Sequence, residues 1–244
     1  MIVTGASRGI GAATSLLAAK QGYAVVVNYN KNRGAAEKVV ADIKSLGGEA
    51  VAIQADISRE EDVLRLFSET DRIFGNLRSL INNAGILEKQ MRLEDMDVAR
   101  LNRIFSANVT GAVLCSREAI KRLSSKHGGP GGTIVNVSSI AARTGAPNEY
   151  IDYAMSKGAI DSLTIGLSKE LADEGIRVNA VRPAFIYTDI HADGGEPGRV
   201  DRIKASIPLK RGGTAEEVAE AILWLAGEHS SYSTGIFIDV TGGR

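Results

Sequence analysis

Cysteine is almost absent from this sequence, since Cys115 is the only one. A single cysteine excludes a disulfide framework or a zinc cluster built within the chain, and it favours a reducing compartment. Cys115 lies inside an apolar helical pattern, so we interpret it as a small buried apolar residue and not as a nucleophile.

The chain also has no excess of positive or negative charge, because 29 lysines and arginines balance 29 aspartates and glutamates. A neutral balance gives no indication of a nucleic-acid or membrane surface as partner. No apolar run reaches the roughly 18 residues of a membrane span, and no charged-then-apolar leader precedes the fold. We therefore expect a cytoplasmic protein that acts on a small molecule, without nucleic-acid or membrane partners.

Histidine is scarce, and His127, His191 and His229 are scattered along the chain. No group of His, Asp and Glu has the spacing of metal ligands, so we predict no metal site. Ser139 lacks the glycine-flanked elbow that presents the nucleophile of a serine hydrolase. These observations leave metal-free chemistry that does not depend on a serine nucleophile.

Apolar runs alternate with helical patterns from one end of the chain to the other. We expect strands at residues 1–4, 24–28, 50–54, 77–81, 133–137, 176–181 and 235–240. Helices are expected at residues 10–22, 35–46, 60–74 with Ser58 as cap, 153–174, and 214–226 with Thr214 as cap. Residues 95–126 are expected to form either two helices or one bent helix, with Asn108 in the middle. The alternation predicts a single α/β domain over residues 1–244, a doubly wound fold with a parallel sheet.

The first expected strand is short for a central strand, where about 5–6 residues is typical. We expect the natural chain to start a few residues upstream. Residues 182–213 have weak periodicity, and a connection of that length is usually a functional lid. The predicted loops at the carboxyl ends of the strands are where ligands bind in such folds.

Tyr153 opens a helical pattern, and Lys157 follows one turn later. Residues four apart share a helix face, so the phenol and the ammonium should lie side by side. A neighbouring positive charge favours the phenolate and should bring the pKa of Tyr153 below its usual value of about 10. Tyr153 is therefore a candidate general acid and base, although an exposed Tyr and Lys on an amphipathic helix would give the same spacing.

Three glycines join the first strand to the first helix in the sequence Gly5-Ala6-Ser7-Arg8-Gly9-Ile10-Gly11. Glycines at this position allow a tight turn and let backbone N–H groups approach a pyrophosphate at the helix N-terminus. A purely structural turn is the alternative. The position between first strand and first helix favours a dinucleotide site.

The charges beside this loop bear on the type of dinucleotide. An acidic residue after the second strand would bind the ribose 2′-hydroxyl of NAD, but Asn30 and then Lys31 and Arg33 stand there. Arg8 adds a cation in the glycine loop itself. Cations without a carboxylate favour the 2′-phosphate, so we predict NADP(H) over NAD(H), with solvated surface charges as the alternative.

Other polar residues at strand ends allow two interpretations each. Asp56 either accepts from an adenine amino group or only stabilises a helix start. Residues 82–85, Asn-Asn-Ala-Gly, either close a strand or hold the glycine loop through their amides. Asn108 is unfavourable in the middle of a helix, and its amide could break the helix and hold a water.

These motifs together resemble the short-chain dehydrogenase/reductase family. The resemblance covers essentially the whole chain, and within the family it is nearest to bacterial glucose 1-dehydrogenases and 3-oxoacyl-[acyl-carrier-protein] reductases. It implies seven strands in the order 3-2-1-4-5-6-7 and a homotetramer, or a homodimer, packed through the long helices. It also implies an NAD(P)-dependent oxidoreductase that moves a hydride between nicotinamide and a carbonyl or secondary alcohol.

The resemblance assigns roles to residues at the matching positions. Tyr153 is the acid and base, Lys157 lowers its pKa and holds the nicotinamide ribose, Ser139 positions the carbonyl oxygen, and Asn108 supports a water that relays protons to Lys157. The implied cofactor-binding residues are Gly5, Ser7, Arg8, Gly9, Ile10, Gly11, Asn30, Asp56, Ile57, Asn82, Ala84, Gly85, Tyr153, Lys157, Pro183, Ile186 and Thr188.

Two departures from the family pattern accompany the short first strand. Ser139 precedes Tyr153 by 14 residues, one more than is common, so Ser138 is a rival for its role. Ala184 replaces the usual glycine after the proline and should crowd the nicotinamide end of the pocket. Two alternatives stay open: a sugar dehydrogenase of glucose type, and a dinucleotide-binding regulator without catalysis, which would need none of the four catalytic residues.

Overall fold

A computed structural model describes all residues, 1–244. Seven parallel strands form one sheet in the order β3-β2-β1-β4-β5-β6-β7, as the sequence predicts. The strands are β1 (Ile2–Val3), β2 (Val25–Tyr29), β3 (Ala50–Gln54), β4 (Ser79–Asn82), β5 (Gly132–Val137), β6 (Ile176–Pro183) and β7 (Phe237–Val240). The short β1 is central, because it pairs with both β2 and β4.

The helices follow the expected positions with shifts of a few residues. They are α1 (Gly9–Lys20), α2 (Arg33–Ser45), α3 (Glu60–Phe74), α4 (Val98–Phe105), α5 (Gly111–Leu123), α6 (Ala141–Thr144), α7 (Ile151–Glu170), α8 (Ile190–Asp193), α9 (Arg199–Ile203) and α10 (Ala215–Ala226). Short 3-10 turns cover Leu93–Asp95, Ser125–His127, Ala172–Glu174, Lys204–Ser206 and Glu228–Ser230.

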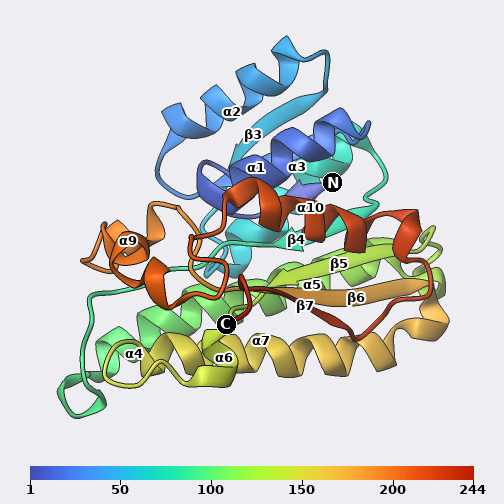
Figure 1. Cartoon of the computed structure of the whole chain (residues 1–244). Helices are drawn as coiled ribbons and strands as arrows, with labels where there is room; N and C mark the ends of the chain where they lie inside the picture. The colour runs from blue at the N-terminus through green and yellow to red at the C-terminus, as the bar shows by residue number, and fades with distance from the viewer.

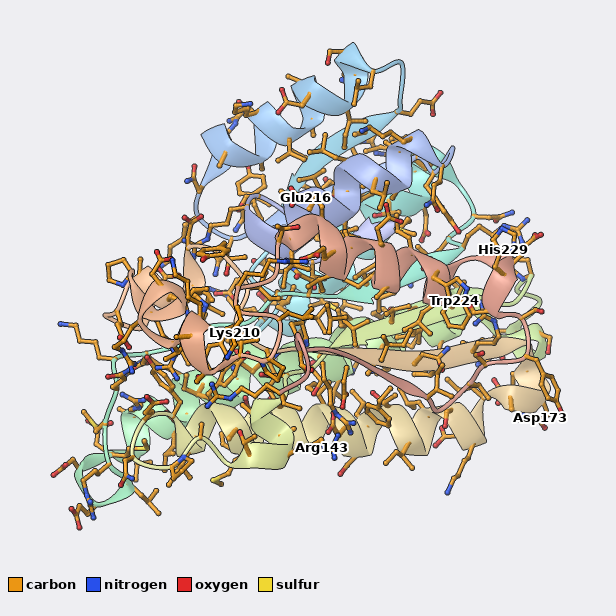
Figure 2. All side chains as sticks on the ribbon, viewed as in Figure 1. Arg143, Asp173, Lys210, Glu216, Trp224 and His229 are labelled. Carbon is orange, nitrogen blue, oxygen red and sulfur yellow. The ribbon has the colours of Figure 1, made fainter.

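Helices cover both faces of the sheet (Figure 1). Helices α2, α1 and α10 pack side by side on one face, and α3, α5 and α7 cover the other. Successive strand residues point to opposite faces, so Val25 and Val27 enter the core under α1 while Val26 enters the core under α3. Side chains fill both layers, and Trp224 on α10 is among the exposed large apolar side chains (Figure 2).

The long helical region is interrupted in its middle. Helix α4 passes into a π-helical segment, Ser106–Thr110, before α5 begins. Asn108 lies at the centre of this segment, where its side chain bonds to a neighbouring loop. The expectation that Asn108 breaks the regular helix is confirmed, and π segments of this kind frequently occur at functional sites.

Two helix starts test the predicted caps. The Thr214 hydroxyl accepts from the backbone N–H of Glu217, and the Glu217 carboxylate accepts from the N–H of Thr214, so the predicted cap of α10 is confirmed. The Ser58 cap is wrong, since α3 begins after Arg59 and Ser58 instead donates to Asp56. Three acidic residues in the first turn of α3 stabilise that start through the helix dipole.

Residues 184–213 form an irregular segment, called the lid below, that carries α8 and α9. It lies beyond one end of the sheet (Figure 1). Its two ends are joined by a bridge between Ile186 and Gly213. No helix in the structure is long and apolar enough to cross a membrane.

Candidate active site

A cleft of about 870 Å³ runs along the carboxyl ends of the strands. Its walls come from the glycine loop after β1, the ends of β2 to β6, the π segment and the lid. The cleft falls within the size range of small-molecule and cofactor sites and lies where doubly wound sheets bind their ligands. It brings together most of the residues that the sequence singles out.

The glycine loop forms a cradle that only glycine can build. Gly5 has φ +61°, and a Cβ there would lie 2.8 Å from the Ala84 Cα. Gly9 has φ +55° at the start of α1. Helix α1 has no side-chain cap and no acidic residue in its first turn, so its N-terminal N–H groups are free to bind an anion in the cleft.

The strand ends hold this loop from behind. The Asn83 side chain donates to the Thr4 carbonyl at 2.8 Å and to the Gly5 carbonyl at 3.1 Å. The Thr4 hydroxyl in turn accepts from the N–H groups of Asn83 and Ala84, both at 3.0 Å. The interpretation that residues 82–85 hold the glycine loop is confirmed. Rigid backbone of this kind suits a phosphate cradle.

Positive charge lines the cleft beside the loop, but from fewer residues than the sequence predicts. Arg8, Asn30 and Lys31 line it. The Arg8 guanidinium pairs with Asp193 on α8 of the lid. Arg33 does not line the cleft, because it lies on the exposed side of α2 and pairs with Glu37. The expectation that Arg33 adds charge to the cofactor site is therefore wrong.

Asp56 stabilises the approach to α3, and its place in the cleft wall is compatible with the adenine contact that stays a prediction. It lines the cleft, and its Oδ1 accepts from the Ser58 N–H at 3.0 Å and from the Ser58 hydroxyl at 2.7 Å. Those two bonds form a turn just before α3. Asp56 therefore stabilises the approach to the helix while its side chain stays at the cleft wall.

Ser139, Tyr153 and Lys157 meet on the part of the cleft wall beside β5. Ser139 follows β5 and lies close enough to Tyr153 on α7 for its hydroxyl to lower the pKa of the phenol. The Lys157 ammonium lies 5.5 Å from the centroid of the Tyr153 ring. Its Nζ donates to the Val137 carbonyl at 2.7 Å, which ties α7 to the end of β5. One helical turn thus presents phenol and ammonium to the same wall, as the spacing predicts.

Burial dominates the electrostatics of this pair. It raises the pKa of Tyr153 to about 12, while the Ser139 hydroxyl acts in the opposite direction. Burial also lowers the pKa of Lys157 to about 8. This direction is opposite to the expectation that Lys157 brings the Tyr153 pKa below 10, because burial disfavours the charged phenolate. Tyr153 is accordingly a protonated phenol at neutral pH.

The two serines after β5 point in different directions. Ser139 Oγ accepts from the Ala141 N–H at 3.1 Å and lies beside Tyr153. Ser138 is almost fully buried, and its hydroxyl donates to Asp161 at 2.6 Å. Ser138 is therefore turned toward a buried carboxylate, and Ser139 is the serine beside the phenol.

Asn108 lies behind this wall and does not line the cleft. Its Oδ1 accepts from the Ile86 N–H at 2.7 Å, and its Nδ2 donates to the Ile86 carbonyl at 3.0 Å and to Ser156 Oγ at 3.1 Å. A Cβ on Gly85 would touch both Asn108 and the Lys157 ammonium, so the three residues are neighbours. The side-chain amide thus fixes the loop after β4 against α7.

Comparison with known proteins connects this geometry to a family. Residues 5–244 match a family described as enoyl-(acyl carrier protein) reductase. The chain belongs to the short-chain dehydrogenase/reductase family. A relative 58% identical over 243 residues, covering 100% of this chain and 98% of its own, is an uncharacterized oxidoreductase, YgfF, of Escherichia coli.

Two further relatives have named activities. A 3-oxoacyl-[acyl-carrier-protein] reductase of Synechocystis is 40% identical over 99% of this chain and 95% of its own. Glucose 1-dehydrogenase 2 of Bacillus subtilis is 36% identical over 99% of this chain and 93% of its own. Both kinds of enzyme are those that the sequence resembles. The chain is thus an oxidoreductase of the short-chain dehydrogenase/reductase family.

Most of the predicted site residues of this family member line the cleft. Those that do are Gly5, Ser7, Arg8, Gly9, Ile10, Asn30, Asp56, Ile57, Ala84, Gly85, Ser139, Tyr153, Lys157, Pro183, Ile186 and Thr188. Gly11 and Asn82 do not. A Cβ on Gly11 would lie 2.5 Å from the Asn83 side chain, and the Asn82 amide bonds with Asn136 and Ser116. Both residues pack the wall from behind.

Sequence reasoning missed several residues of the cleft. Asn28 Oδ1 accepts from the Gly5 N–H at 3.2 Å, and its Nδ2 donates to the carbonyls of Ile53 and Ala55. A polar side chain within the otherwise apolar strand β2 is the sequence feature that could have identified Asn28 as part of the site. Ile86 and Ile190 also line the cleft near the lid, and so does His191, for which the sequence of residues 182–213 allowed either a polar pocket rim or an exposed position. Burial lowers the pKa of His191, so this side chain is neutral at neutral pH.

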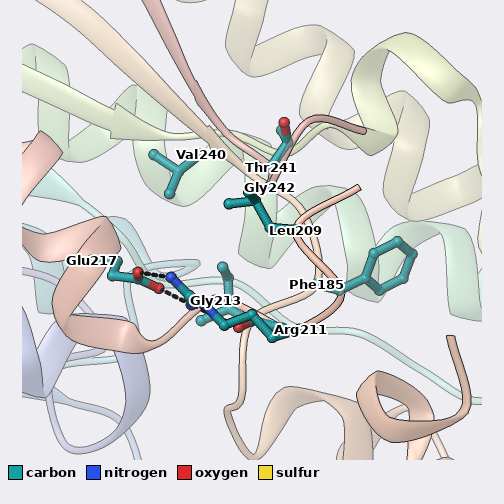
Figure 3. A pocket seen from close by; sticks show the side chains of 10 residues that line it. Phe185, Leu209, Arg211, Gly213, Glu217, Val240, Thr241 and Gly242 are labelled. Carbon is teal, nitrogen blue, oxygen red and sulfur yellow. Dashed lines mark hydrogen bonds and ion pairs between the residues drawn. The ribbon is translucent and has the colours of Figure 1, made fainter. Parts of the chain in front are cut away.

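A second, smaller cavity of about 120 Å³ lies on the other side of the lid, between its end and β7. Figure 3 shows Arg211 and Glu217 joined across it by hydrogen bonds and an ion pair. Phe185, Leu209 and Val240 make much of the remaining wall. Arg211 and Glu217 are paired with each other, so neither charge is free to act on a ligand. The large cleft is therefore the candidate active site.

Proposed function

We propose that this protein is an NADP(H)-preferring oxidoreductase that reduces a carbonyl compound or oxidises the corresponding secondary alcohol. The single observation that carries the proposal is the cleft itself, where an uncapped helix N-terminus after β1 and the side chains of Ser139, Tyr153 and Lys157 beside β5 face the same space. A dinucleotide that lay along it would have its phosphates at the glycine loop and its nicotinamide beside Tyr153.

Residues of the chain fit this cofactor. Gly5, Gly9 and the N-terminus of α1 would hold the pyrophosphate, and Asp56 would contact the adenine. Ile186 and Thr188 would hold the carboxamide. A Cβ on Gly9 would come within 3.4 Å of the Thr188 side chain, so loop and lid approach each other closely there. When bound, the nicotinamide supplies or takes the hydride.

The side chains of Tyr153, Ser139 and Lys157 would support the transfer of the proton. The Tyr153 phenol would donate its proton to the oxygen of the reduced carbonyl, and the Ser139 hydroxyl would orient that oxygen. The raised pKa of about 12 keeps the phenol protonated, which suits the direction of reduction. The Lys157 ammonium would hold the nicotinamide ribose and stabilise the tyrosinate that the step leaves.

NADP(H) is preferred in this proposal because of the charges around Asn30. No acidic residue ends β2, where a carboxylate would bind a ribose 2′-hydroxyl and repel a phosphate. Arg8 and Lys31 line the same part of the cleft. Two cations without a competing carboxylate on β2 favour the 2′-phosphate.

The test is the substitution Tyr153→Phe, with Tyr232→Phe as matched control because Tyr232 is fully exposed. We expect Tyr153→Phe to abolish NADPH-dependent reduction of a carbonyl panel while NADPH affinity, read by fluorescence titration, stays within about twofold. The control should behave as the wild type. Comparable turnover in Tyr153→Phe would overturn the assignment of the phenol.

The panel should separate the two activities named among the relatives. A 3-oxoacyl thioester tests the reductase activity. Glucose with NADP or NAD tests the alternative, a sugar dehydrogenase, which the 36% identity with glucose 1-dehydrogenase 2 supports. Tight NADPH binding without turnover of any substrate would instead favour a dinucleotide-binding regulator.

The proposed setting is a cytoplasmic homotetramer, or a homodimer. Apolar side chains that are exposed in the single chain support assembly, among them Val98 on α4, Val113 on α5, and Met155 and Ile165 on α7. The region from α4 through α5 and the helix α7 correspond to the long helices through which the family resemblance implies packing. Light scattering of the purified protein would read the number of chains directly.

A further inference from the structure

Asp161 lies beneath the candidate active site and joins three elements. Its Oδ1 accepts from the Ser138 hydroxyl at 2.6 Å, and its Oδ2 accepts from Arg182 at 2.8 Å and 3.0 Å. Ser138 directly follows β5, Asp161 is on α7 and Arg182 is on β6. The Asp161 and Arg182 side chains are only 14% and 15% exposed, so this is a largely buried pair.

Each member of this group is placed next to a residue of the site. Ser138 precedes Ser139 in the chain, and Arg182 precedes Pro183, whose carbonyl accepts from Ser139 Oγ at 3.5 Å. Asp161 follows Lys157 by four residues, one helical turn. A displacement of Asp161 would therefore be transmitted to the serine, the lysine and the cleft wall together.

The group is also a row of alternating charges that runs from the site to the surface. Lys157, Asp161 and Arg182 are followed by Asp239, whose carboxylate lies 3.5 Å from Arg182 and 2.8 Å from Arg143. Arg143 is on α6 at the surface (Figure 2). A buried charge is stable only when it is paired, so each ion in the row compensates its neighbour.

Asp161 is the one carboxylate whose field acts on the Lys157 ammonium. From other elements, Lys157 faces the Val137 carbonyl, Gly85 and the Asn108 amide, none of which is ionisable. From its own helix it faces Tyr153 and Asp161. Burial lowers the Lys157 pKa, and the Asp161 carboxylate acts in the opposite direction.

We propose that Asp161 is a positioning residue of this enzyme, which holds Ser139 and Lys157 in place through Ser138 and Arg182 and supplies the opposite charge one helical turn from the Lys157 ammonium. Its catalytic consequence rests on the proposed function, since it acts through Lys157 and Ser139. Its effect on the charge of Lys157 is a property of the folded chain alone and can be measured without turnover.

The experiment measures the titration of Lys157 in the full chain by NMR with lysine labelled at 13Cε. The Lys157 resonance is the one that disappears in Lys157→Arg. In Asp161→Asn we expect its midpoint to move to lower pH by roughly 0.5–1 unit, because the removal of an opposite charge favours the neutral amine. The alkaline limb of kcat for carbonyl reduction should move in the same direction by the same amount.

Two variants separate charge from position. Ser138→Ala keeps the carboxylate but removes its bond to β5, so we expect an unchanged Lys157 midpoint and a kcat lowered about tenfold. Asp239→Asn removes the outer partner of Arg182 and leaves the Asp161–Arg182 pair, so both the midpoint and the alkaline limb should stay in place. Asp161→Glu should keep the midpoint within about 0.3 unit and lower kcat.

The proposal is overturned if the Lys157 midpoint in folded Asp161→Asn equals that of the wild type. If Asp161→Asn does not fold, wild-type kcat in both Asp161→Glu and Ser138→Ala overturns it instead. A failure of the proposed function would appear differently, as turnover in Tyr153→Phe or as no turnover in the wild type, and the NMR titration would still decide the role of Asp161.

Discussion

Arg8 of the glycine loop forms an ion pair with Asp193, a residue 185 positions further along the chain on α8 of the lid. The pair joins the glycine loop, which would bind the cofactor phosphates, to the lid. Arg8 is also the cation that the proposed function assigns to the NADP 2′-phosphate. One guanidinium is therefore shared between a lid carboxylate and a cofactor phosphate.

Replacement of Arg8 by alanine should weaken NADPH binding far more than NADH binding. A charge-assisted hydrogen bond contributes about 1.5–3 kcal/mol, which corresponds to roughly a tenfold to hundredfold loss of NADPH affinity. Fluorescence titration of both cofactors measures the ratio. Arg33→Ala is the matched control, because Arg33 pairs with Glu37 outside the cleft and its loss should leave both affinities unchanged. Equal preference in wild type and Arg8→Ala would show that Arg8 is only a surface charge.

Removal of the lid carboxylate should have the opposite effect on NADPH. In Asp193→Asn the guanidinium has no competing anion, so NADPH should bind more tightly by up to about fivefold, the range of an exposed ion pair. NADH affinity should not change. Asp201→Asn is the control, since Asp201 lies on α9 of the same lid but pairs with Lys204. An NADPH affinity that falls in Asp193→Asn would mean that the ion pair builds the cofactor site and does not compete with it.

The rate of carbonyl reduction should fall as the pH rises through about 8. Lys157 is charged below its pKa of about 8 and neutral above it, whereas Tyr153, with a pKa of about 12, stays protonated across this range. We expect kcat to drop about tenfold per pH unit above the lysine pKa. Lys157→Arg carries a guanidinium that stays protonated, so whatever its absolute rate, its profile should lose this limb. A wild-type profile that stays flat from about pH 7 to 10 would contradict the role of the ammonium.

The buried Arg100–Asp152 pair should be a strong determinant of stability beside the site. Arg100 Nε donates to Asp152 at 2.6 Å, and Asp152 Oδ1 also accepts from the Tyr153 N–H at 2.9 Å. Asp152→Asn leaves a buried guanidinium without its counterion, which typically costs about 3–5 kcal/mol. We expect the Tm to fall by roughly 10 °C in a thermal melt.

The matched control is Asp42→Asn, which removes one partner of the exposed Lys38–Asp42 pair on α2. An exposed helical pair contributes about 0.3–0.5 kcal/mol, so the melt of that variant should nearly coincide with the wild type. Equal Tm changes in the two variants would contradict the importance of burial.

Much of the fold and of the candidate site could be predicted from the sequence because local rules decide those parts. Buried parallel strands are continuous apolar runs, and the glycines of the loop at residues 5–11 have few structural alternatives. The four-residue spacing of Tyr153 and Lys157 places them on one helix face. Strand order came from the family resemblance and was confirmed by the sheet.

Other features depend on contacts, some local and some between distant segments, that residue type and spacing do not determine. Ser58 has the chemistry of a helix cap, but the nearby Asp56 carboxylate takes its hydroxyl. Arg33 is close in sequence to the cofactor site, yet α2 turns it away from the cleft. The Tyr153 pKa depends on burial by several elements, which a spacing cannot measure. The sequence of the helix gives no sign that Asp161 is largely buried, because its burial depends on contacts with Ser138 after β5 and Arg182 on β6.

The two glycines Gly5 and Gly22 allow the steric demand of the cradle to be separated from the backbone demand. Both have positive φ, +61° and +87°, so alanine at either should cost about 1–2 kcal/mol of conformational strain. At Gly22 no atom lies within 4 Å of a new Cβ, so we expect no loss of stability beyond this strain. At Gly5 the Cβ would lie 2.8 Å from the Ala84 backbone, so the loop must move.

We expect Gly5→Ala to lose at least about 1 kcal/mol more than Gly22→Ala in urea denaturation, in the range for overpacking. Its NADPH affinity should also fall, because the N–H groups of the cradle shift. Gly22→Ala should bind NADPH as the wild type does, and equal losses of stability and affinity in the two variants would refute the cradle at Gly5.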